Sequence, residues 1–218
     1  MLIQEIKDKV NKICENKGIS KTGRTFKEID FIFGELRKLA LEIGFDDNLG
    51  KELVNTKVDV LMIIGAMLMI PENMSEYEIY DYLEECDNPF FIDEIAYNTY
   101  LKNPLFPYLD SFIYSPNPAQ ARFGWDIATF KVMKNNILDL NIDSLLEYLE
   151  KRMLSFDKLA QYSMNRFLCE LGLYVDEYME KAIETGKRIG PLSSKKASIG
   201  FSTYAPDYII ANRARQKF

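Results

Sequence analysis

Residues 158–190, KLAQYSMNRFLCELGLYVDEYMEKAIETGKRIG, decide the fold of this chain. Apolar residues recur there in two series, which are Ala160, Met164, Phe167, Leu168 and Leu171, and then Val175, Tyr178, Met179, Ala182 and Ile183. Each series follows the 3.6-residue period of an α-helix and lays one apolar stripe along it. The stretch therefore predicts two consecutive amphipathic helices.

The residues at the ends of these helices predict how the two helices are joined. Asp157 can cap the first helix, and Gly172 can adopt the left-handed conformation that ends it. Only Leu173 and Tyr174 then remain as a linker, so we expect the helices to pack antiparallel. One hairpin cannot bury two apolar stripes, so it needs helical neighbours.

The rest of the chain supplies such neighbours. Helical periodicity predicts further helices at residues 2–16, from 26 to about 43, 49–55, 58–69, 75–86, 89–101, 105–114, 118–134, 142–154 and 206–215. The segment 58–69 is apolar nearly all round, and a buried strand is the competing interpretation. Its length and its Leu, Met and Ala content favour a helix.

Helix starts carry recognisable capping signals. Thr25 with Glu28, and Ser75 with Glu78, have the spacing of a capping box. Three Asn-Pro pairs place an Asn at the N-cap and a Pro at the first helical position, at Asn88, Asn103 and Asn117.

These patterns predict an all-α protein with no strand. Hairpins recur every ~35–45 residues, which is typical of HEAT-like repeats. We therefore expect a HEAT-like superhelix of stacked antiparallel helical hairpins that forms a single domain over residues 1–218. An irregular helical bundle is the alternative.

Composition excludes several kinds of chemistry. The 218 residues contain no His, so neither a His-dependent nucleophile pair nor a His-based metal site is available. Cys14, Cys86 and Cys169 are isolated and odd in number, which indicates free thiols and a cytoplasmic location. We expect no metal, no cofactor and no membrane span, since the longest apolar run is too short to cross a bilayer.

Charge is distributed unevenly along the chain. The formal net charge is −6, yet the segment 186–218 carries seven basic residues and one acid. The basic residues are Lys187, Arg188, Lys195, Lys196, Arg213, Arg215 and Lys217. A solvated basic tail is one interpretation of this segment, and a phosphate-binding patch is the other.

Several motifs resemble the DNA alkylation repair family, whose members are HEAT-like superhelical domains. The C-terminal third matches best, with AQYSMNRFLCELGLYVDEYMEKAIETGKRIG and the closing APDYIIANRAR. Weaker similarities lie in FGELRKLA (residues 33–40), CDNPFFID (residues 86–93) and ARFGWDIA (residues 121–128). The resemblance implies binding of double-stranded DNA and hydrolysis of the N-glycosidic bond of cationic alkylated purines.

The resemblance also implies site residues. Asp93 matches the family's catalytic aspartate, with Pro89 where the family has a tryptophan. Trp125 falls near a family tryptophan that is followed by arginines, and Arg122 is the arginine beside it. Asp93 could instead be a first-turn acid that favours the helix dipole, and Trp125 could be a core aromatic.

Two functions remain open at this point. The first is a DNA-binding helical-repeat protein of the alkylation repair type, with Asp93 and Trp125 as catalytic residues. Its expected DNA contacts are Arg122, Lys187, Arg188, Lys195, Lys196, Arg213 and Arg215. The second is a catalytically inactive helical-repeat scaffold that binds another protein.

Overall fold

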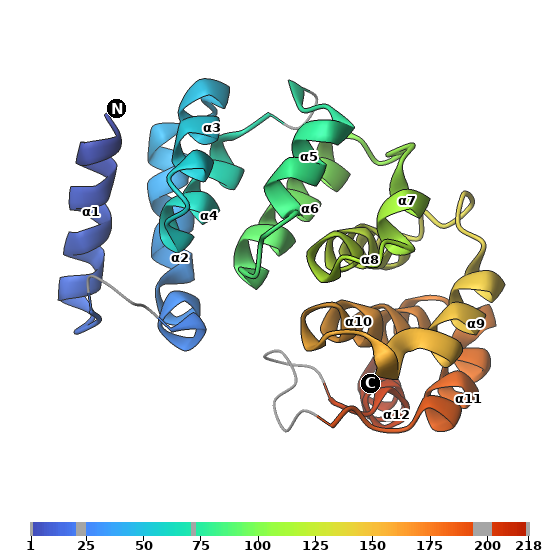
Figure 1. Cartoon of the computed structure of the whole chain (residues 1–218). Helices are drawn as coiled ribbons and strands as arrows, with labels where there is room; N and C mark the ends of the chain where they lie inside the picture. The colour runs from blue at the N-terminus through green and yellow to red at the C-terminus, as the bar shows by residue number, and fades with distance from the viewer. Residues whose placement is uncertain (1, 21–24, 71–72, 194–201, 217–218) are drawn as a thin grey trace. The chain divides into compact units, whose positions relative to one another are not determined.

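The computed structural model describes residues 2–20, 25–70, 73–193 and 202–216, without the side chains of Phe26 and of residues 214–216. All regular structure in these ranges is helical, as predicted (Figure 1). The chain forms two compact units, Met1–Glu78 (unit 1) and Ile79–Phe218 (unit 2). The prediction of a single domain stays a prediction.

The described residues of unit 1 form four α-helices and the start of a fifth. They are α1 (Ile3–Asn16), α2 (Phe26–Ile43), α3 (Asp47–Asn55), α4 (Asp59–Leu68) and α5 (Glu76–Leu83). Both predicted capping boxes form, because Thr25 Oγ1 accepts from the Glu28 N–H and Ser75 Oγ accepts from the Glu78 N–H.

The apolar segment of unit 1 is helical, not a strand. Helix α4 buries eight of its ten residues. It lies very close to α3, since a Cβ on Gly65 would be 2.7 Å from the carbonyl oxygen of Gly50. Side chains larger than hydrogen would separate the two backbones.

Unit 2 contains the two helices of residues 158–190 and the helices that pack against them. They are α6 (Pro89–Lys102), α7 (Leu109–Ile113), α8 (Pro118–Met133), α9 (Ile142–Arg152), α10 (Lys158–Tyr174), α11 (Met179–Ile189) and α12 (Ala205–Gln216). Neighbouring helices in the series α6, α8, α10 and α12 pack against one another, and α11 packs against α9, α10 and α12 (Figure 1). Helices α8 and α10 are buried on nearly all sides and form the centre of the unit.

One predicted helix start is wrong. Asn88 and Asn117 cap α6 and α8 as expected, but Asn103 is the C-cap of α6. The next helix begins at Leu109 instead of Leu105. Pro107 explains the delay, because a residue that precedes proline, here Phe106, is disfavoured in the helical conformation.

The predicted role of Gly172 is also wrong. Helix α10 runs past Gly172 to Tyr174, and a short 3₁₀ turn, Asp176–Tyr178, leads into α11. Gly172 is instead a contact point, because a Cβ there would lie 2.5 Å from Cδ1 of Ile209 on α12. Sequence alone does not reveal this contact, since Ile209 is 37 residues further along the chain.

The three cysteines are free thiols, with Cys14 and Cys169 buried. Among the described residues no helix has the length and apolar character needed to cross a membrane.

Candidate nucleic-acid interface

Asp93 on α6 and Arg122 on α8 form a bidentate ion pair. Arg122 Nε donates to Asp93 Oδ1 at 2.6 Å, and Arg122 Nη2 donates to Asp93 Oδ2 at 2.9 Å. Arg122 Nη1 also donates to the carbonyl oxygen of Leu159 on α10, at 2.9 Å. One guanidinium group therefore joins three consecutive inner helices.

Asp93 is accessible although its partner is buried. The Asp93 side chain is 35% exposed, whereas that of Arg122 is 8% exposed. Asp93 lies beyond the first turn of α6, so the alternative of a first-turn acid is wrong. Its position is set by the Asn88 cap, which starts the helix, and by the bond to Arg122.

The environment keeps Asp93 ionised. Burial by itself would raise the pKa of Asp93, but the charge and hydrogen bonds of Arg122 outweigh it, with smaller contributions from Asp126 and Arg166. The pKa of Asp93 is consequently below its ordinary value. The charge of Asp93 raises the pKa of Arg122 against the opposing effect of burial.

Two further charged residues lie next to this pair. Asp126 is one turn after Arg122 on α8, and its carboxyl group is 3.8 Å from Arg122 Nε and 4.0 Å from Arg166 Nη1. Asp126 is fully buried, whereas the Arg166 side chain is 23% exposed. Burial and the nearby charge of Asp93 raise the pKa of Asp126 well above its ordinary value.

Aromatic side chains continue the same surface. Tyr97, one turn after Asp93, is 36% exposed and meets Phe130 edge to face at 5.3 Å between ring centroids. The Arg166 guanidinium lies 5.3 Å from the centroid of the Phe130 ring. We refer to Asp93, Tyr97, Arg122, Phe130 and Arg166 as the inner surface of unit 2.

The sequence identified Asp93 and Arg122 but missed three members of the inner surface. A helical spacing of four residues was the available signal, since Tyr97 follows Asp93 and Phe130 follows Asp126 at that interval. Arg166 carried no such signal, because it reaches the site from α10.

Trp125 lies in the core of unit 2. It is 0% exposed and packs against Phe167 at 5.1 Å and Tyr148 at 6.2 Å between ring centroids. This is the position that the alternative interpretation, a core aromatic, describes. The structure therefore does not bring Trp125 to the surface beside Asp93.

The predicted DNA contacts in α11 and α12 form ion pairs within the protein. Lys187 binds Glu184 at 2.7 Å, and Arg188 binds Glu150 at 2.8 Å. Arg213 donates to the carbonyl oxygen of Gly172 at 3.0 Å and also pairs with Asp176. Lys195 and Lys196 lie outside the described residues, as does the side chain of Arg215.

The ends of the segment that carries Lys195 and Lys196 are fixed on unit 2. The Leu192 N–H donates to the carbonyl oxygen of Thr203 at 2.9 Å. Asn165 Nδ2, on α10, donates to the carbonyl oxygen of Ser202 at 2.9 Å. Because Asn165 is adjacent to Arg166 in the sequence, this anchor lies on the helix that contributes to the inner surface.

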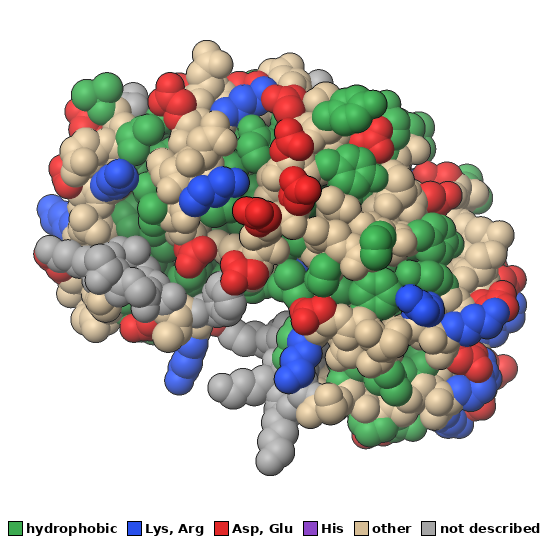
Figure 2. Space-filling model, in the orientation of Figure 1, with side chains coloured by type: hydrophobic (Ala, Val, Ile, Leu, Met, Phe, Trp, Pro, Cys, Tyr) green, Lys and Arg blue, Asp and Glu red, His purple; other side chains and the backbone are tan. Residues whose placement is uncertain are grey.

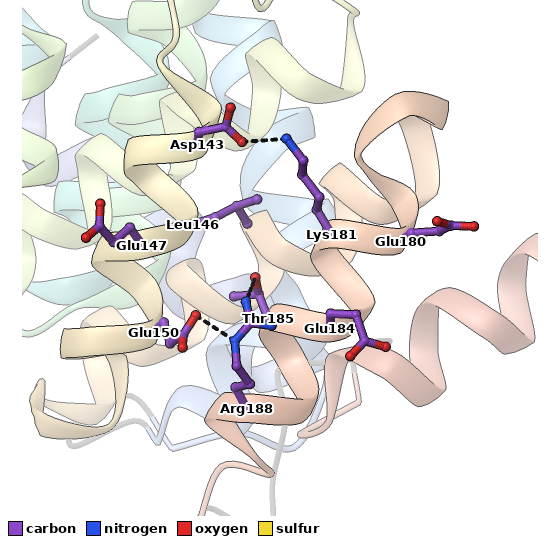
Figure 3. Close-up of a pocket in the computed structure, with 9 residues that line it drawn as sticks. All are labelled: Asp143, Leu146, Glu147, Glu150, Glu180, Lys181, Glu184, Thr185 and Arg188. Carbon is purple, nitrogen blue, oxygen red and sulfur yellow. Dashed lines mark hydrogen bonds and ion pairs between the residues drawn. The ribbon is translucent and has the colours of Figure 1, made fainter.

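A second surface feature lies between α9 and α11, and acidic side chains predominate in it. It is a hollow of about 440 Å³ lined by Asp143, Leu146, Glu147, Glu150, Glu180, Lys181, Glu184, Thr185 and Arg188 (Figure 3). Lys181 pairs with Asp143 and Arg188 with Glu150 across the two helices. We call this feature the acidic groove; in its region of Figure 2, acidic and basic side chains are interspersed.

Among the described ranges there is no group of three or more Cys, Asp or Glu side chains that could hold a metal ion.

Comparison with solved structures gives the fold a name. No protein-family model matches the chain, and no curated protein matches it significantly. A solved structure described as "A new family of proteins related to the HEAT-like repeat DNA glycosylases with affinity for branched DNA structures" aligns with a TM-score of 0.73. The alignment covers 84% of this chain and 80% of the other, at 20% identity.

The chain has the HEAT-like repeat fold. The prediction of fold class is thereby confirmed, and the similarity agrees with the resemblance seen in the sequence. At this level of identity the HEAT-like match defines the fold alone.

Proposed function

We propose that the protein binds DNA through the inner surface of unit 2. The observation that carries this proposal is the exposed ring of Tyr97, which meets Phe130 edge to face while the Arg166 guanidinium lies over the Phe130 ring. The shared fold adds support, since the matching protein is described as having affinity for branched DNA.

The chemistry of the inner surface suits a nucleic acid. Aromatic rings and guanidinium groups stack on bases irrespective of sequence. The basic segment 186–218, in which the carbonyl oxygen of Ser202 accepts from Asn165 on α10, is the proposed source of phosphate contacts. Lys195 and Lys196 are its most suitable members, because Lys187, Arg188 and Arg213 already pair with acids.

A finer proposal is hydrolysis of the N-glycosidic bond of a cationic alkylated purine. Such a base is a good leaving group, so stabilising a positively charged sugar is the main task of the enzyme. Asp93 is ionised and accessible, as this task requires, whereas Trp125 contributes to the core only. We expect the reaction to need no metal or cofactor, and we expect the protein to act in the cytoplasm.

The test is a pair of measurements on the same variants. Fluorescence anisotropy with a four-way junction and a linear duplex measures binding, and release of methylated purine from alkylated duplex measures hydrolysis. Asp93→Asn should abolish release, while Asp143→Asn, a change on the acidic groove, should leave it unchanged. Equal release by Asp93→Asn and wild type would remove Asp93 from the mechanism.

The acidic groove favours a second function, a scaffold for a basic protein partner. Five acids and two bases line it, so it repels phosphate and attracts Lys- or Arg-rich segments. Wild-type protein that binds neither DNA probe at low salt would make this scaffold function the leading proposal. Binding of a basic peptide that Glu180→Lys weakens would then support it.

A further inference from the structure

Asp126 is a buried carboxyl group to which no side chain or backbone group of the described residues donates a hydrogen bond. It is 1% exposed, and among the described residues neither of its oxygens accepts a hydrogen bond. An ionised carboxylate in such a place is strongly disfavoured, because it has lost its hydration and gained no donor in return.

The charged groups that face Asp126 do not offset this loss. They are Asp93 from α6, Arg122 from its own helix and Arg166 from α10. The two guanidinium groups lie 3.8 and 4.0 Å away, beyond a good hydrogen bond. The Arg122 nitrogen nearest Asp126 is Nε, and its single N–H is already donated to Asp93.

More distant ionisable groups act on the two arginines. Tyr162 raises the pKa of Arg122 slightly, and Glu170, which burial keeps at a raised pKa, interacts with Arg166. Neither group donates a hydrogen bond to Asp126, so the balance at Asp126 is set by its burial and by the adjacent Asp93.

Protonation of Asp126 removes the cost of burying its charge. Two carboxyl groups in one buried site titrate apart, and the more accessible one keeps its charge. We propose that Asp126 keeps its proton at neutral pH and donates a hydrogen bond through it to the Asp93 carboxylate, as a positioning residue that fixes this carboxylate. The proposal rests on the role proposed above for Asp93 and adds a second acid, which does not contact the substrate.

This protonation changes the charge of the inner surface. With Asp126 neutral, the group of Asp93, Arg122, Asp126 and Arg166 has one negative and two positive charges. The net charge of these four groups is then +1 instead of the zero expected from the sequence, which favours binding of a phosphate backbone.

The first test counts charges without DNA. Asp126→Asn should leave the net charge at pH 7 unchanged in native capillary electrophoresis, since it replaces one neutral group by another. Asp143→Asn, which removes an ionised group, should shift the mobility by one charge. A one-charge shift for Asp126→Asn would overturn the proposal.

The second test follows the carboxyl carbons by ¹³C NMR during a pH titration. In wild type, the Asp126 carboxyl carbon should have the shift of a protonated acid at pH 7, while that of Asp93 is ionised. Asp126→Asn keeps a donor, so the pKa of Asp93 should not change, whereas Asp126→Leu should raise it. A lowered pKa of Asp93 in Asp126→Asn would mean that a negative charge had been removed, which contradicts the proposal.

These tests separate the inference from the proposed function. Both are independent of DNA, so a protein that fails to bind any DNA probe can still reveal whether Asp126 is protonated. If Asp126→Asn does not fold, the wild-type spectrum at pH 7 decides alone.

Discussion

The side chain of Ile209 on α12 lies directly over Gly172 on α10. A Cβ at Gly172 would be 2.5 Å from Ile209 Cδ1 and 2.9 Å from Cγ1, and Ile209 is itself fully buried. One turn after Ile209, Arg213 donates to the carbonyl oxygen of Gly172. The last helix is thus held on the central helix by packing and by a hydrogen bond at the same residue.

Gly172→Ala should therefore destabilise unit 2. Alanine gains about 1 kcal/mol in helix propensity, but overpacking a buried contact typically costs ~1–3 kcal/mol. We expect a net loss of about 1 kcal/mol in urea unfolding. The matched control is Gly34→Ala on α2, where no atom lies within 4 Å of the added Cβ, and this variant should gain stability. A gain in both variants would mean that α12 does not pack as described.

The two Asn-Pro pairs that flank α6 should respond differently to alanine. Asn88 Oδ1 accepts from the N–H groups of Phe90 and Phe91, so Asn88→Ala should cost about 1 kcal/mol. Asn103 is exposed and caps no helix start, so Asn103→Ala should change the free energy of unfolding by less than about 0.5 kcal/mol. Equal losses of stability in the two variants would indicate that Asn103 caps a helix start as the sequence predicts.

Phe167 should be among the most costly core positions. It is 0% exposed and packs edge to face on Trp125. Phe167→Ala should lower the free energy of unfolding by about 3–5 kcal/mol, measured from urea midpoints. Tyr77, which is 79% exposed, provides the control, and Tyr77→Ala should leave the midpoint nearly unchanged.

The raised pKa of Asp126 predicts how stability depends on pH. Above about pH 4, Asp126 is ionised in the unfolded chain but protonated in the folded protein, so the folded state binds more protons. Its contribution to stability should therefore be lost progressively as the pH rises from about 4 through the folded pKa. Asp126→Asn removes this dependence.

The measurement is the difference in unfolding free energy between Asp126→Asn and wild type at pH 5 and pH 8. The variant should gain stability relative to wild type at the higher pH. A difference that is the same at both pH values would show that Asp126 has an ordinary pKa.

Local signals in the sequence were sufficient for the helices. The capping boxes at Thr25 and Ser75, and the caps at Asn88 and Asn117, act within four residues, so the sequence contains both partners of each contact. The Asn-Pro pair at Asn103 has the same local signal but starts no helix, since Pro107 disfavours the helical conformation at Phe106.

The site was less predictable because it is assembled across helices. Asp93 and Arg122 came from the family resemblance, but their bond joins residues that are 29 positions apart. Arg166 and the burial of Trp125 depend on how α8 packs on α10, which no short pattern encodes. The role of Gly172 is equally non-local, since its partner Ile209 is on α12.

Binding of a four-way junction by Tyr97→Glu tests the central claim most directly. Tyr97 is exposed on the inner surface beside Asp93, and a carboxylate there removes a stacking ring and repels phosphate. The matched control, Tyr77→Glu, makes the same change on unit 1. The account predicts at least about fivefold weaker binding for Tyr97→Glu, from a stacking loss of ~1–3 kcal/mol, and wild-type affinity for Tyr77→Glu. Wild-type affinity in Tyr97→Glu would contradict it.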